Sequence, residues 1–343
     1  MRLLLLSSGK KEIMMQEPGS SATVIGVDIG GTKVAVGLVD QNGKILSQLR
    51  RPMLANGLPE AALEVVMAAI DSLSAQLEGG SSAAAKGIGL CAPGPLDPAT
   101  GIVMNPPNLP CWRNFPLVSR VTEKYRLPVK LDNDANAAAL AETLWGAARG
   151  YGYVFYATIG TGIGTGIVLD GRIYHGRTGA AGEGGHVSID YRGPVCPCGK
   201  RGCIEVLAAG PAIGARARAK LSALPSRHSA LLDLANGKID NVTSELVGQA
   251  HAAGDPLARE ILEETIELLA VWFGNIVDLL DPDVIVMGGG VAAMLHPFFD
   301  DIKNRLPSWC VNPRASEIPL LIAHYGADAG IAGGAALCSD LSA

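Results

Sequence analysis

The sequence has few aromatic residues and no long apolar run. Aromatic side chains make up 5% of the 343 residues although 48% are hydrophobic, so aliphatic residues must form the core. No stretch of about 18 consecutive apolar residues occurs, which argues against a transmembrane helix. The four leucines Leu3–Leu6 are too few for the apolar part of a secretion signal. We therefore expect a cytoplasmic protein with no membrane partner.

An excess of positive charge is also missing. The chain has 28 Lys and Arg residues against 33 Asp and Glu residues, which gives a net charge of −5 and a pI near 5.7. A general nucleic-acid-binding surface needs the opposite charge, so we expect no nucleic-acid partner. Only 27 residues precede Asp28, too few for a winged DNA-binding domain in front of the first strand.

Two common nucleotide-binding motifs are absent. The Gly-x4-Gly-Lys-Ser/Thr sequence of a P-loop does not occur, and no Gly-x-Gly-x-x-Gly lies in a βαβ context. Apolar strand segments instead alternate with segments of helical periodicity, which predicts an α/β fold. We expect strands at 23–29, 34–40, 44–48, 86–91, 128–131 and 283–287. We expect helices at 59–77, 116–125, 133–142, 210–235, 256–280 and 326–336.

The chain contains an internal duplication. Residues 24–40 superpose without gaps on residues 154–170, with an Ile-Gly turn and a closing Asp in both copies. This repeat predicts two α/β domains that each begin with a β-hairpin. We assign residues 23–132 to the first domain and 133–326 to a larger second domain. Residues 1–22 are expected to be a disordered tail or a mis-assigned start, and a helix at about 327–343 to pack back on the first domain.

The two hairpin turns are rich in glycine. Facing each other, they would present backbone N–H groups to phosphate oxygens from two sides, although a tight turn alone explains the glycines of either copy. Asp28 suits a Mg²⁺ contact, and side-chain donors come from Thr32, Lys33, Thr161 and Thr165. A third glycine turn at 288–290 suits close approach by a nucleotide base or ribose, or is a plain turn.

Asn133 and Asp134 lie at a strand-to-helix junction. They could simply cap the helix. A carboxylate at this point is also expected to stay ionised beside the helix N-terminus, as a general base for a hydroxyl nucleophile requires. A polar set that could bind several hydroxyl groups consists of Asn105, Asn108, Asn133, Glu183 and Glu205.

Three cysteines lie within eight residues. Cys196, Cys198 and Cys203, with His186 upstream, form a Cys3His set that suits tetrahedral zinc, while the alternative is buried thiols or a disulfide. The spacing is not that of a zinc finger. His186 could bind zinc through one ring nitrogen and offer the other to a ligand. The other four cysteines are scattered singly, which fits a reducing compartment.

These segments resemble the ROK family of repressors, open reading frames and kinases, within the sugar kinase and actin superfamily. The resemblance covers residues 23–338 and rests on Asp-Ile-Gly-Gly-Thr-Lys (28–33), Ala-Pro-Gly-Pro (92–95), Asn-Pro-Pro-Asn-Leu-Pro-Cys-Trp (105–112), Asn-Asp-Ala-Asn-Ala-Ala-Ala-Leu-Ala-Glu (133–142), Gly-Thr-Gly-Ile-Gly-Thr-Gly-Ile (160–167), Glu-Gly-Gly-His (183–186) and Cys-Pro-Cys-Gly-Lys-Arg-Gly-Cys-Ile-Glu (196–205). It implies a two-domain actin-like (RNase H-like) ATPase fold with an interdomain cleft. Thr165 departs from the family pattern, where many members have glycine.

The resemblance also implies residue roles. Asp134 would be the catalytic base, and the zinc ligands would be His186, Cys196, Cys198 and Cys203. Substrate contacts carry over to Gly94, Asn108, Asn133, Asp134, Glu183, His186 and Glu205. ATP contacts would be Asp28, Gly30, Gly31, Thr32, Lys33, Gly160, Thr161, Gly162 and Gly289. The implied cofactors are a structural Zn²⁺ and the Mg²⁺ that accompanies ATP.

The function implied by the resemblance is ATP-dependent phosphorylation of a hexose, with the 6-hydroxyl of glucose as first choice. N-acetylmannosamine, N-acetylglucosamine, mannose and fructose remain alternatives, as does polyphosphate as the donor. A ROK repressor, a sugar sensor without catalysis and an actin-like assembly protein are the alternatives from other classes. A homodimer or dimer of dimers is expected.

Overall fold

Two five-stranded sheets of the same construction form the framework of the molecule. The computed structural model describes residues 23–75, 85–223 and 228–341, so the predicted tail lies outside the described residues. The first sheet has the strand order β3 (Ile45–Pro52), β2 (Lys33–Asp40), β1 (Thr23–Ile29), β4 (Ile88–Ala92), β7 (Val129–Asn133). The second has the order β10 (Arg172–Ile173), β9 (Ile163–Leu169), β8 (Tyr153–Ile159), β11 (Val284–Gly288), β12 (Leu320–Ile322).

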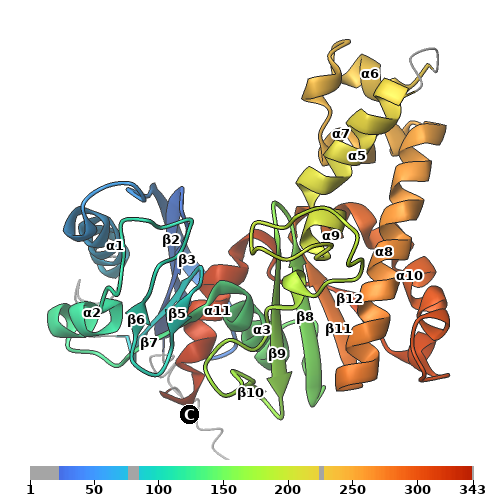
Figure 1. The fold of residues 1–343 in the computed structure, drawn as a ribbon. Helices are drawn as coiled ribbons and strands as arrows, with labels where there is room; N and C mark the ends of the chain where they lie inside the picture. Colours follow the sequence, from blue (N-terminus) through green and yellow to red (C-terminus); the bar gives the residue numbers. More distant parts are fainter. Residues whose placement is uncertain (1–22, 76–84, 224–227, 342–343) are drawn as a thin grey trace, which may run out of the picture.

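The pairing of the strands confirms the duplication. In each sheet the first three strands are antiparallel, and the last two are parallel to the hairpin's first strand. The hairpin β1–β2 therefore corresponds to β8–β9, as the superposed sequences predict. The two sheets are visible on either side of the molecule in Figure 1.

Helices α3 (Asp134–Leu144) and α11 (Ala329–Leu337) lie between the two sheets (Figure 1). Helix α11 packs directly on the backbone of the first sheet. A Cβ atom on Gly26 would lie 2.0 Å from the Ile331 carbonyl oxygen, and one on Gly89 would lie 1.7 Å from that of Gly334. Glycine is therefore required at these strand positions, because any side chain would push the helix off the sheet.

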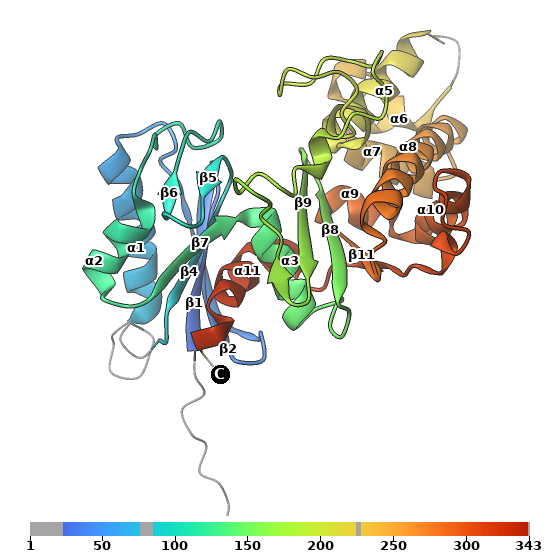
Figure 2. The same ribbon diagram turned by 60° about the horizontal axis from the view of Figure 1, so that its bottom comes forward.

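The remaining helices cover the outer parts of the molecule. Helices α1 (Pro59–Ser74) and α2 (Leu117–Tyr125) cover the outer face of the first sheet, and Figure 2 shows the others gathered beyond the second sheet. These are α4 (Glu205–Ala208), α5 (Gly210–Ala223), α6 (Ala230–Leu234), α7 (Ser244–Ala252), α8 (Pro256–Leu280), α9 (Gly289–Leu295) and α10 (Phe299–Arg305). A small ribbon of β5 (Leu96–Asp97) and β6 (Ile102–Val103) and several single 3₁₀ turns complete the described chain.

The predicted elements agree with most of these. The helix predicted at 256–280 is found with the same limits as α8, because Asp255 caps its first turn and Pro256 occupies its first position. The prediction of one helical stretch at 210–235 is wrong in detail, because α5 and α6 are separate helices. Helices α7, α9 and α10 and strand β12 were not predicted. The domain limits remain a prediction.

Candidate active site

Asn133 and Asp134 lie where β7 passes directly into α3. The Asn133 Oδ1 atom accepts hydrogen bonds from the backbone N–H groups of Ala135 (2.9 Å) and Asn136 (3.4 Å), so Asn133 caps the helix. The Asp134 carboxylate accepts one from Ala135 N at 2.8 Å. The capping role expected for this junction is thus confirmed. These capping bonds involve neither the Asn133 Nδ2 group nor the second Asp134 oxygen.

The surroundings of Asp134 raise the pKa of its carboxyl group from 3.8 to about 6. The main cause is burial among protein atoms, and the negative charges of Asp28 and Glu183 add to it. Asp134 is nevertheless exposed at its surface, so solvent or a ligand can still reach it. The hydrogen bond from Ala135 at the helix N-terminus lowers the pKa but offsets only part of the desolvation. The group is still largely ionised at neutral pH and is more basic than an ordinary carboxylate.

The predicted sugar-binding residues come from loops that meet at this junction. A Cβ atom on Gly94 would lie 3.7 Å from Asn133 Nδ2, since Ala92 of β4 pairs with Asn133 of β7. The backbone of Asn108 packs on Gly31, so that the loop before α2 touches the first glycine turn. Asn105 and Asn108 are exposed in that loop. Glu183 is exposed as well and lies near enough to Asp134 to raise its pKa.

Glu205 joins the cysteine loop to the second glycine turn. It is the first residue of α4, and its Oε2 atom accepts a hydrogen bond from Ile163 N at 2.9 Å. A Cβ atom on Gly162 would lie 2.6 Å from the same oxygen, so a side chain there would displace the Glu205 carboxylate. The carboxylate thus contacts the turn predicted to hold phosphate, as well as following the cysteines in sequence.

The predicted Cys3His set converges on one point. The ligand atoms of His186, Cys196, Cys198 and Cys203 all lie within 4.8 Å of one another. The Cys196 sulfur is 3.6 Å from His186 Nδ1, and the Cys198 and Cys203 sulfurs are 3.7 Å apart. Zinc bonds of about 2.3 Å to sulfur and 2.0 Å to nitrogen give tetrahedral edges of about 3.5–3.8 Å, so the donor set fits zinc. The cysteines form no disulfide. Because Nδ1 faces the cysteines, Nε2 of His186 is left for another partner.

Thr165 does not serve as a phosphate donor. Its side chain is buried at 3% exposure, and its hydroxyl donates to the Gly182 carbonyl oxygen and accepts from Gly184 N at 2.7 Å. The expectation that this residue faces phosphate is therefore wrong. Each side chain of a β-strand points to one face of the sheet, and that of Thr165 points to the face that packs against the segment around Glu183.

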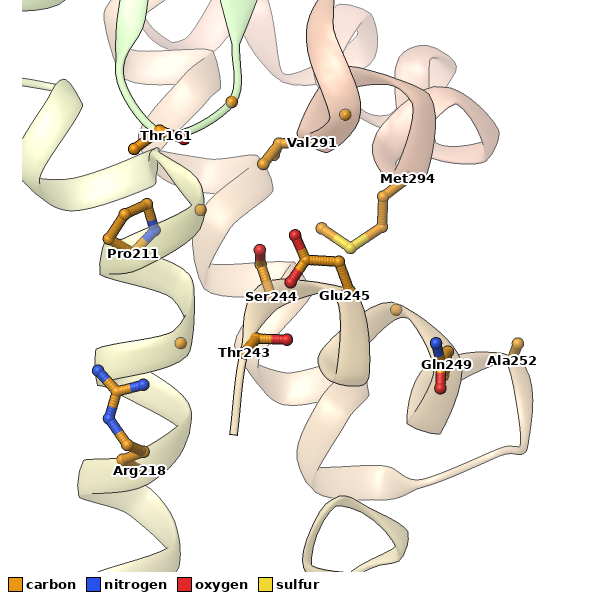
Figure 3. Close-up of a pocket in the computed structure, with 15 residues that line it drawn as sticks. Thr161, Pro211, Arg218, Thr243, Ser244, Glu245, Gln249, Ala252, Val291 and Met294 are labelled. Carbon is orange, nitrogen blue, oxygen red and sulfur yellow. The ribbon is translucent and has the colours of Figure 1, made fainter. Parts of the chain in front are cut away.

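A cavity of about 810 Å³ lies between the second glycine turn and the helices beyond it. Figure 3 shows Thr161 at one end, with Ser244, Glu245 and Met294 around the middle and Arg218 at the other end. The lining comprises Gly160, Thr161, Gly210, Pro211, Gly214, Arg218, Thr243, Ser244, Glu245, Gly248, Gln249, Ala252, Gly290, Val291 and Met294. Its size matches a small-molecule site of nucleotide dimensions.

The sequence predicted two glycine turns of this cavity but not its helical walls. Gly160 and Thr161 line it as predicted, and the third glycine turn contributes Gly290. Gly289 lies just outside, where its positive φ of 87° and close approach to Ile159 exclude other residues. The α5 and α7 walls were missed. Gly210 and Gly214, one helical turn apart, mark the face of α5 that lines the cavity.

The first glycine turn lies on the other sheet. Gly30 N donates to the Lys33 carbonyl oxygen at 2.9 Å, which closes the turn, while Thr32 and Lys33 are exposed. Asp28 packs against Gly330 of α11, and burial raises the pKa of its carboxyl group although Lys33 and Arg50 oppose the effect. A second acid with a raised pKa beside Asp134 is the kind of arrangement that a bound cation relieves.

The fold and the site define an α/β protein of the actin-like ATPase class with a Cys3His centre. The chain belongs to the ROK family, whose model matches residues 24–340. The glucokinase of Thermotoga maritima is 32% identical over 317 residues, which are 92% of this chain and 97% of that protein. The N-acetylmannosamine kinase of Escherichia fergusonii is 31% identical over 315 residues, 92% of this chain and 98% of that protein.

A solved structure has the same fold. The ROK family glucokinase from Streptomyces griseus, in complex with glucose and AMPPNP, superposes with a TM-score of 0.77 at 33% identity, covering 92% of this chain and 99% of that one. The family and the actin-like fold predicted from the sequence are thus confirmed. Among the residues that the structure describes, no helix combines the length and apolar character needed to cross a bilayer.

Proposed function

We propose that this ROK sugar kinase transfers the γ-phosphoryl group of ATP to the 6-hydroxyl of glucose, with Asp134 as the general base. The observation that carries the proposal is the position of Asp134 at the β7–α3 junction, with a pKa raised to about 6 and with Asp28 and Glu183 beside it. A base must be ionised yet able to accept a proton, and this pKa meets both requirements. The glucose and AMPPNP bound by the Streptomyces griseus relative support the choice of substrates.

In this proposal the sugar lies at the junction of the loops. The amide of Asn133, the carboxylates of Glu183 and Glu205 and the free Nε2 of His186 hold its hydroxyl groups, with Gly94 and Asn108 at the margin. Asp134 accepts the proton of the attacking hydroxyl. Exclusion of water matters, since the same base would otherwise activate water and waste ATP.

The nucleotide would occupy the cavity of about 810 Å³, with its phosphates toward Gly160 and Thr161 and the first glycine turn opposite. Asp28 is the residue best placed to meet Mg²⁺, which would supply positive charge to the phosphates. Zinc would be structural, because four protein ligands leave no open position for catalysis. It would fix the 3₁₀ turn Gly184–His186 relative to Glu205.

A second substrate is favoured by one finding. The N-acetylmannosamine kinase relative is almost as similar as the glucokinase, and acetylated and plain hexoses differ only around C2. N-acetylglucosamine, mannose and fructose follow for the same reason. The cytoplasmic location and the homodimer or dimer of dimers remain predictions, of which the second is checked by sedimentation analysis.

The test is an ADP-release assay with MgATP over a panel of hexoses and N-acetylhexosamines, with Asp134→Asn as the blank. Turnover highest on glucose is expected. Preference for an acetylated sugar would move the function to amino-sugar phosphorylation. Turnover with polyphosphate but not with ATP would show that polyphosphate, not ATP, is the phosphoryl donor. Zinc-loaded protein that binds ATP but phosphorylates no sugar would overturn the kinase proposal in favour of a sensor.

A further inference from the structure

A histidine from the second sheet contacts the first sheet directly behind the catalytic junction. His175 follows β10, the end strand of the second sheet, and Asp132 lies in β7, the end strand of the first sheet. The His175 Nε2 atom is 2.6 Å from Asp132 Oδ2. The Asp132 side chain is 4% exposed and that of His175 is 35% exposed, so the carboxylate is the buried partner.

The other oxygen of Asp132 holds the catalytic junction. Asp132 Oδ1 accepts hydrogen bonds from Asn133 N at 2.7 Å and from Asn136 Nδ2 at 3.0 Å. These two groups lie on either side of Asp134 in sequence. The Asn136 side chain also packs against Gly182, the residue before Glu183. One buried carboxylate thus fixes the first turn of α3, and His175 satisfies its remaining oxygen.

No other cation described here contacts that oxygen. Lys130, on the same strand as Asp132, is paired with Asp340 at 2.6 Å. Arg172 lies in β10, three residues before His175, and lines the same cavity. All of these groups line a cavity of about 750 Å³ whose wall comes from both sheets. Open space rather than packed side chains therefore separates the sheet edges around the Asp132–His175 pair.

We propose that His175 is a positioning residue of the kinase reaction, which holds Asp132 and thereby the Asn133–Asp134 junction while it connects the two sheets. The inference rests on the proposed function. A buried carboxylate that loses its partner must take up a proton or move toward water. Protonation weakens the hydrogen bonds that Asp132 Oδ1 accepts from Asn133 and Asn136, and movement toward water breaks them. A base displaced by even about 1 Å can lose on the order of a hundredfold in rate.

The pair also has a defined pH dependence. The hydrogen bond with Asp132 raises the pKa of His175 above its usual 6.5. The charged pair therefore contributes its full stabilisation below pH 6.5, and this contribution is lost as the pH rises through the raised value. Neutral imidazole can still donate a hydrogen bond, so the loss at high pH is partial.

The experiment compares His175→Ala and His175→Gln with the control His228→Gln, each zinc-loaded and assayed well below its unfolding temperature. His228 faces Asp233 at 3.6 Å on the surface, where both side chains are exposed. We expect His175→Ala to lower kcat on the order of ten- to a hundredfold with the KM for ATP unchanged. Because glutamine keeps an N–H donor, His175→Gln should recover most of the loss, and the control should match the wild type. Wild-type kcat and sugar KM in folded His175→Ala would overturn the proposal.

Thermal unfolding separates this inference from the kinase assignment. The unfolding temperature of His175→Ala should fall further below the wild type at pH 6 than at pH 9. His175→Gln cannot carry the charge, so its smaller gap to the wild type should also be wider at pH 6. A gap that does not depend on pH overturns the charged pair even in an active enzyme. If the wild type phosphorylates no sugar, the proposed function fails, and with it the positioning role, whereas the pH-dependent gap still establishes the contact between the sheets.

Discussion

The hydroxyl of Thr165 holds the backbone on both sides of Glu183. It accepts a hydrogen bond from Gly184 N at 2.7 Å and donates one to the Gly182 carbonyl oxygen. A strand residue of the second hairpin therefore fixes the turn that carries Glu183 and His186. This contact links the second hairpin to the segment that is proposed to bind the sugar.

Replacing Thr165 by valine keeps the shape of the side chain and leaves both backbone groups without a partner. Each buried group costs about 1–3 kcal/mol when unsatisfied, so the 182–184 segment should shift. We expect Thr165→Val to raise the KM for the sugar about tenfold or more with little change in the KM for ATP, and Thr165→Ser to restore it.

Thr143→Val is a matched control for this change. Thr143 is also buried, but its hydroxyl donates only to the Ala139 carbonyl oxygen of its own helix. Its loss should leave the sugar KM unchanged. An equal increase in both valine variants would show that general destabilisation, rather than the Glu183 segment, is responsible.

The raised pKa of Asp134 predicts opposite effects on activity and stability. Activity should fall below about pH 6 as the base is protonated. Asp134→Asn should lower kcat by about 10²–10⁴-fold while sugar binding persists. The folded state binds the proton more tightly than the unfolded chain, so the ionised group destabilises the fold above its unfolded pKa of 3.8.

Asp134→Asn should therefore raise the unfolding temperature at pH 7. This gain should be largely lost near pH 4, where the wild-type carboxyl is protonated in the folded state and close to half protonated in the unfolded chain. Differential scanning calorimetry at several pH values measures it. Near-normal turnover of the variant, or a gain that persists at pH 4, would contradict the role assigned to the carboxylate.

Removal of zinc should weaken sugar binding more than nucleotide binding. Cys198→Ala leaves three ligands, and His186 loses the fixed orientation that Nδ1 coordination would give it. We expect the zinc content to fall from one ion per chain toward zero and the sugar affinity to fall with it. Cys310→Ala, a substitution outside the cluster, should keep both. Wild-type kinetics in a zinc-free Cys198→Ala protein would remove any role of the metal in sugar binding.

Features set by neighbouring residues could be predicted from the sequence, and features set by packing could not. The Cys3His cluster lies within 18 residues of the sequence, and the hairpin repeat lies in two short segments, so both could be predicted. The raised pKa of Asp134 could not be predicted, because it comes first from burial and then from Asp28 and Glu183, which are distant in sequence. Asp132 and His175 are 43 residues apart on the ends of different sheets, and no local pattern connects them.

The nucleotide cavity allows a prediction that spares the sugar site. Gly248 lines it, and a Cβ atom there would lie 2.8 Å from the Met294 sulfur, a flexible neighbour that can yield. Gly248→Leu should therefore fold, since leucine favours the helix more than glycine does, and its side chain should fill space meant for the nucleotide. We expect the KM for ATP to rise about tenfold or more with the dissociation constant for sugar unchanged. Ala253→Leu, at the exposed end of the same helix, should change neither constant. If ATP bound Gly248→Leu as well as wild type, the cavity would not be the nucleotide site.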